Sequence, residues 1–151
     1  MFLSLSPTIN IRASFLSPRF LGTGEILSAI CIGAYGVKTY FKASEDWKIV
    51  WSGRGSKNAI LERCVFKSSK DDVYLVADAY EGSQIKMAVT DFLSAAAGVA
   101  KETVSFKIRS VEVSFAAAGD ADVIVYVGHD AFMDFQIPPI AGTREINPVE
   151  Q

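Results

Sequence analysis

The only histidine of the chain, His129, follows an apolar run at residues 123–127 and stands between Gly128 and Asp130. An imidazole titrates near neutral pH, so it suits a general base that deprotonates a nucleophile. Gly128 would permit a sharp exit from a strand and close approach of a substrate. The sequence therefore predicts His129 as the candidate general base, at the carboxyl end of a buried β-strand.

Two carboxylates are candidates for orienting this imidazole, as a third group does in catalytic triads. Asp130 follows His129 directly, and Asp78 lies near the end of a second apolar run at residues 73–79. In open parallel sheets, ligands bind outside the carboxyl ends of the strands, where both segments would deliver polar residues. The alternative is that His129 only ends a strand and that Asp78 and Asp130 are turn-forming or solvated residues.

A partner nucleophile for His129 is not evident. Cys31 and Cys64 both precede it, and their separation matches no zinc or redox motif. They are interpreted as buried thiols in a reducing compartment, with a single disulfide as the alternative. Residues 53–55 (Gly-Arg-Gly) lack the lysine and threonine of a phosphate loop. We therefore expect no metal and no cofactor.

Hydrophobic periodicity and turn residues predict the elements that would position these groups. Helices are expected at 25–43 and 84–97, the second with Ser83 as N-cap and Gly98 as C-cap. Strands are expected at 47–51, 59–67, 73–79, 103–109, 111–115 and 123–127. The first two form a β-hairpin, and charged Glu62 and Arg63 in its second strand indicate a place near a sheet edge.

The order strand, helix, strand predicts an α/β fold with a mostly parallel sheet flanked by helices and an added β-hairpin. The β-branched and aromatic content of the run at 73–79 favours a strand buried on both faces, as in parallel sheets. We expect one domain over residues 21–142, a poorly defined segment at 1–20 and a polar tail at 143–151.

Composition excludes several classes of protein. The chain has 151 residues, half of them hydrophobic, and a net charge of −2, so nothing favours nucleic acid as a partner. The longest uncharged stretch, residues 26–37, is too short to cross a membrane. Residues 1–24 contain serine and arginine but no acidic residue, which is typical of organellar targeting segments. A cytoplasmic location is the favoured alternative.

The run VIVYVGHDA, an apolar strand followed by Gly-His, resembles the caspase-like cysteine peptidases, which include caspases and gingipains. The blocks YGVKTYFK, ILERCVF, VYLVADAYEG and DFLSAAAG are similar to uncharacterised bacterial members of this superfamily. The resemblance covers roughly residues 20–137. It implies that His129 ends one central strand and that a nucleophilic cysteine ends the next strand along the chain.

The chain departs from that pattern at two places. Asp130 stands where the group usually has glycine, and no cysteine follows His129. The resemblance therefore implies an incomplete caspase-like domain that is inactive alone, since an imidazole without a thiolate cannot supply covalent catalysis. The alternative is a non-catalytic binding module that takes a protein or peptide, including a strand from another chain along a sheet edge. A small hydrolase with an unrecognised serine is a third hypothesis.

Overall fold

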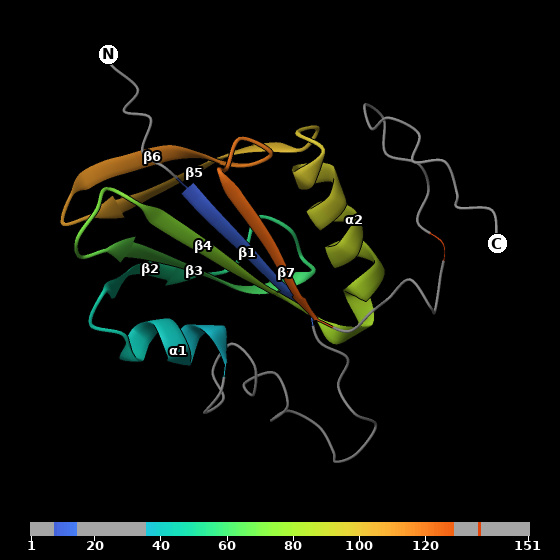
Figure 1. Ribbon diagram of the computed structural model, residues 1–151, viewed down its shortest axis with the longest axis horizontal. Helices are drawn as coiled ribbons and strands as arrows, with labels where there is room; N and C mark the ends of the chain where they lie inside the picture. The colour runs from blue at the N-terminus through green and yellow to red at the C-terminus, as the bar shows by residue number, and fades with distance from the viewer. Residues whose placement is uncertain (1–7, 15–35, 129–135, 137–151) are drawn as a thin grey trace.

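The computed structural model describes residues 8–14, 36–128 and 136, with only the backbone for 8–14 (Figure 1). Its centre is a five-stranded sheet in the order β2-β3-β4-β1-β7. The strands are β1 (Thr8–Ser14), β2 (Trp47–Gly53), β3 (Ile60–Ser68), β4 (Tyr74–Tyr80) and β7 (Val123–Gly128). A separate two-stranded sheet consists of β5 (Lys101–Ile108) and β6 (Val111–Ala118). The helices are α1 (Val37–Ala43) and α2 (Ile85–Ala96). A 3-10 turn, η2 (Gly82–Gln84), directly precedes α2.

The prediction of a mostly parallel sheet, as part of an incomplete caspase-like fold, is wrong. Among the described strands, β1 pairs in parallel with β4 and β7, whereas β2–β3, β3–β4 and β5–β6 are antiparallel. Only residues 69–73 join β3 to β4. A parallel connection needs a crossover of a dozen or more residues, so this short link forces the two strands to run in opposite directions.

The prediction that β4 is buried on both faces is confirmed, but for a different reason from the one inferred. On one face, Tyr74 and Val76 form a core cluster with Phe115 and other residues of the β5–β6 hairpin. On the other face, Leu75 and Ala77 belong to a cluster against which Phe41 of α1 packs. Coverage of both faces by separate elements, not parallel pairing, explains why this strand is apolar at every position except Asp78.

The interior strand β1 comes from the segment for which the sequence suggested no element. It pairs with β4 on one side and β7 on the other. Its sequence, TINIRAS, alternates isoleucine and alanine with asparagine, arginine and serine. Such alternation is typical of a half-exposed strand, so it gave no indication of a position in the middle of a sheet.

Two expectations about sheet edges are corrected. Strand β3, expected near an edge because of Glu62 and Arg63, lies between β2 and β4. Both charges have ion-pair partners there, Lys38 for Glu62 and Asp78 for Arg63. Conversely β7, expected to be buried, is the last strand of the described sheet and is half-exposed along its length.

Helix α2 confirms the prediction for residues 84–97 to within one residue at each end. Its C-terminus is a Schellman motif, in which Gly98 N–H donates to Ala95 O and Val99 N–H donates to Ser94 O. Gly98 has φ of 71°, a conformation that glycine adopts without steric cost. The expected N-cap at Ser83 is wrong, because η2 precedes the helix and its N-cap residue, Gln84, makes no side-chain capping bond.

Candidate functional site

The carboxyl ends of the three parallel strands lie level with one another. Ser14, the last residue of β1, pairs with Tyr80 at the end of β4 and with Gly128 at the end of β7. The candidate site expected from the sequence is at this edge, and Gly128 does end a strand there. His129 and Asp130 follow Gly128 in the sequence but lie outside the described residues, so their roles stay predictions.

Asp78 does not stand at that edge with an open carboxylate. It lies within β4, directly opposite Arg63 of β3, and is 1% exposed. Arg63 donates from Nε to Asp78 Oδ1 at 2.6 Å and from Nη2 to Oδ2 at 2.8 Å. Both carboxylate oxygens are therefore engaged by one guanidinium, an arrangement typical of a structural ion pair.

Glu102, the second residue of β5, completes this cluster from the other sheet. Arg63 donates from Nη1 to Glu102 Oε1 at 2.5 Å and from Nη2 to Oε2 at 3.1 Å. The Glu102 side chain is 24% exposed, whereas that of Arg63 is 6% exposed. Arg63 thus connects the five-stranded sheet to the β5–β6 hairpin through two carboxylates.

The charge balance of this cluster explains why Arg63 stays ionised. Burial on its own lowers the pKa of the Arg63 guanidinium, because it penalises the charged form. Hydrogen bonds to Asp78 and Glu102, together with their negative charges, outweigh burial and raise the pKa above its ordinary value. The arginine is therefore positively charged in the folded protein, and the cluster of one cation and two anions carries one net negative charge.

Sequence reasoning did not identify Arg63 and Glu102 as one unit with Asp78. A signal was present, because Arg63 interrupts the apolar segment ILERCVF and Asp78 interrupts VYLVADA. Charged residues are rarely buried unless paired, so two opposite charges in two buried strands indicate a pair. The contribution of Glu102 depends on how the hairpin packs on the sheet, which the sequence pattern does not specify.

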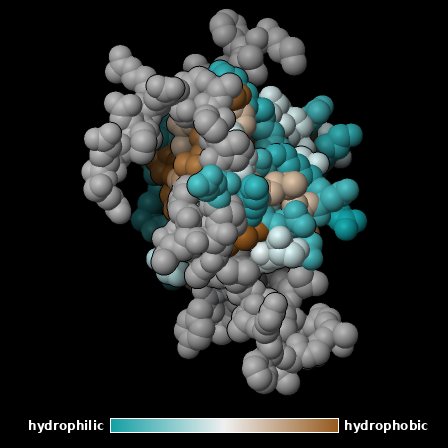
Figure 2. All heavy atoms as spheres, turned by 90° about the vertical axis from the view of Figure 1, so that its right-hand side faces the viewer, coloured by the Kyte–Doolittle hydropathy of each residue, from teal (hydrophilic) through white to brown (hydrophobic). Residues whose placement is uncertain are grey.

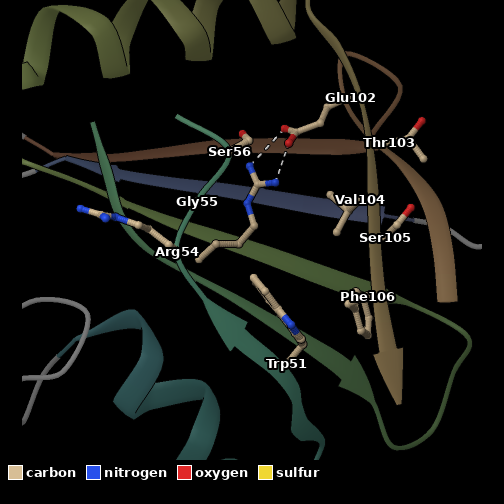
Figure 3. A pocket seen from close by; sticks show the side chains of 10 residues that line it. Trp51, Arg54, Gly55, Ser56, Glu102, Thr103, Val104, Ser105 and Phe106 are labelled. Atoms are coloured by element: carbon tan, nitrogen blue, oxygen red, sulfur yellow. Dashed lines mark hydrogen bonds and ion pairs between the residues drawn. The ribbon is translucent and has the colours of Figure 1, made fainter. Parts of the chain in front are cut away.

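A shallow groove of about 230 Å³ opens beside this cluster, between β5 and the loop after β2. Figure 3 shows Ser56 near Glu102, with Trp51 and Phe106 farther along the groove and the side chain of Arg54 directed away from Glu102. A second hollow of about 310 Å³ shares Ser56 and Glu102 with it.

Each charged side chain that lines the second hollow has an ion-pair partner. Lys57 Nζ lies 2.7 and 2.6 Å from the two carboxylate oxygens of Asp91, which also accepts a hydrogen bond from the Tyr80 hydroxyl at 2.9 Å. Lys101 pairs with Asp120 at 2.6 Å. The first pair links the β2–β3 loop to α2, and the second joins the two ends of the β5–β6 hairpin. With two lysines and two carboxylates, the lining of this hollow has no excess charge to attract a ligand.

The two outer strands of the sheet differ in a way that bears on binding. Strand β2 carries the exposed Lys48, and its pairing with β3 is interrupted by a register shift between Ile49 and Trp51. Strand β7, VIVYVG, contains no charge and no proline and pairs with β1 without a register shift. Lysine and bulges are devices that protect edge strands from pairing with other chains, and β7 has neither.

Within the described ranges, no group of three His, Cys, Asp or Glu residues is arranged to hold a metal ion. The helices of that part of the chain are also too short or too polar to cross a membrane.

Comparison of the chain with protein-family models, with curated proteins and with solved structures gives no match.

Proposed function

We propose that this chain is a protein-interaction module that accepts an additional β-strand along the outer edge of β7. The observation that carries the proposal is the contrast between the two edges of the sheet: β2 is protected by a lysine and a bulge, and β7 is regular and uncharged. An edge strand presents backbone N–H and C=O groups that form hydrogen bonds with an extended peptide.

The side chains of β7 indicate the chemistry of the partner. Val123 is 46% exposed and Val127 is 38% exposed, so both ends of the strand present apolar surface to a neighbour. On the side of the molecule that faces the viewer in Figure 2, hydrophobic and hydrophilic residues lie next to one another. Aromatic and β-branched residues stabilise cross-strand pairs. The expected partner is therefore an extended, uncharged segment with β-branched or aromatic residues.

The described carboxylate cluster supports a binding role over a catalytic one. Asp78, the candidate orienting group, is held on both oxygens by Arg63 and is almost fully buried. A general base or an orienting group needs an oxygen within reach of the proton or imidazole that it serves. The geometry instead suits a fixed scaffold on which β7 is presented.

Amide hydrogen exchange on the full chain tests the proposal. The probe is a soluble peptide of alternating threonine and valine with lysine at both ends. Because β1 covers only one side of β7, about half of the β7 amides should exchange quickly in dilute protein and become protected when the peptide is added. Val127→Lys should reduce that protection, and Val111→Lys, at a valine 64% exposed in β6, is the matched control.

Two results would contradict the proposal that β7 binds an additional strand along its outer edge. The first is uniform slow exchange of every β7 amide in dilute protein without peptide, which would mean that the edge is already covered. The second is fast exchange that the peptide does not change at any concentration.

A second candidate is a domain related to the caspase-like peptidases that lacks the nucleophile and is inactive alone. The level carboxyl ends of β1, β4 and β7 favour it, because ligands of parallel strands bind at such an edge and Gly128, which precedes His129 in the sequence, ends β7 there. The expected outcome is no cleavage of peptide substrates by the purified chain. Robust cleavage that His129→Ala abolishes would refute this candidate.

A further inference from the structure

We infer that the strand accepted by β7 comes from a second copy of this chain, with the two β7 strands antiparallel about Val125. This inference rests on the proposed function and names its partner. The sequence of β7 is nearly symmetric about Val125, with Val123 and Val127 at equal distances on either side. An interface between two identical chains related by a twofold axis requires such self-complementarity.

The pairing that this symmetry specifies is favourable at every position. Val123 of one copy would stand opposite Val127 of the other, Ile124 opposite Tyr126, and Val125 opposite itself. Each pair combines β-branched or aromatic residues, and such cross-strand pairs stabilise antiparallel sheets. No charge is placed in these pairs, because residues 123–127 contain none.

The exposure of the side chains agrees with this register. Val123 and Val127, which would face each other across the twofold axis, are the two β7 valines with the greatest exposure. Ile124 and Tyr126 lie on the opposite face of the strand, where Phe92 of α2 contacts Tyr126 with ring centroids 5.6 Å apart. The dimer would therefore join the two five-stranded sheets into one and gather the valines of both copies in a single apolar strip.

A pair of double variants tests the register as well as the dimer. Val123→Lys with Val127→Lys places like charges opposite each other twice across the twofold axis. Val123→Lys with Val127→Glu places opposite charges at the same positions. Both variants alter only exposed side chains, so circular dichroism should show an unchanged fold for each.

The measurement is the molar mass of the full chain by sedimentation equilibrium over a wide concentration series. We expect the mass of the unmodified chain to double with concentration. The two-lysine variant should weaken dimerisation by about thirtyfold or more, and the lysine–glutamate variant should recover most of that loss. Val111→Lys should dimerise like the unmodified chain.

The outcomes separate this inference from the proposed function. The chain could stay monomeric while the threonine–valine peptide protects its β7 amides. That result would contradict the β7–β7 dimer but would still support the binding of an additional strand along β7. A monomer whose β7 amides the peptide does not protect would overturn both. A dimer equally stable in both double variants would show that another surface mediates it, which also contradicts the inference.

Discussion

Arg63 and Asp78 face each other on neighbouring strands, joined by two hydrogen bonds of 2.6 and 2.8 Å in the interior of the sheet. Removing one partner of a buried pair leaves an uncompensated charge, which costs about 3–5 kcal/mol. Because Glu102 still pairs with Arg63, Asp78→Ala should fall at the lower end of that range. Urea unfolding, monitored by circular dichroism, measures the loss.

The exposed ion pair between Lys67 and Asp72 provides the control for that experiment. Its side chains are 33% and 61% exposed, so Asp72→Ala should change the free energy of unfolding by about 1 kcal/mol or less. Equal losses in Asp78→Ala and Asp72→Ala would contradict a structural role for the buried pair. The raised pKa of Arg63 means that its contribution is present at any pH below the ordinary pKa of a guanidinium and is lost only above it.

A second prediction concerns the buried hydroxyl of Tyr80, which donates to Asp91 Oδ2 at 2.9 Å. Tyr80 is 4% exposed, so Tyr80→Phe removes a hydrogen bond without opening a cavity. The expected cost is about 1 kcal/mol of unfolding free energy. Tyr40→Phe, at a side chain 71% exposed, should cost nothing measurable in the same thermal unfolding assay. No difference between the two variants would show that the Tyr80 bond contributes little.

The turn between β5 and β6 gives a stabilising prediction. Arg109 and Ser110 both have positive φ, at 47° and 75°, as a two-residue type I′ hairpin requires. Glycine is favoured there, since other residues lose about 1 kcal/mol or more in this conformation. Ser110→Gly should therefore raise the free energy of unfolding by up to about 1 kcal/mol. A lower midpoint of thermal unfolding in this variant would argue against the turn geometry.

A fourth prediction concerns Gly98, which ends α2 with φ of 71°. Alanine at this position would carry its Cβ into a conformation disfavoured by about 1–2 kcal/mol. Gly98→Ala should lower the free energy of unfolding by about 1 kcal/mol, measured by urea titration. The comparison variant is Ser94→Ala within the helix, which keeps the backbone carbonyl that accepts from Val99. Its effect should be smaller, and the opposite order would contradict the Schellman motif.

The sequence by itself determined the local elements whose pattern is repeated over several residues. Helix α2, the β2–β3 hairpin and the extended runs that form β4 and β7 were predictable, because side-chain periodicity and turn residues act over short distances along the chain. The N-terminal limit of α2 was less certain, since Ser83 has the composition of an N-cap but lies in a 3-10 turn.

Only the tertiary structure decided which strands are neighbours and in which direction they run. The placement of β1 between β4 and β7, the interior position of β3 and the edge position of β7 depend on contacts between residues far apart in the sequence. The same holds for the convergence of Arg63, Asp78 and Glu102, which come from three strands in two sheets. Periodicity indicates which side of a strand is apolar, but it carries no information on which element packs against that side. Packing between residues far apart in the sequence determines both the order of the strands and which charged residues meet in the buried cluster.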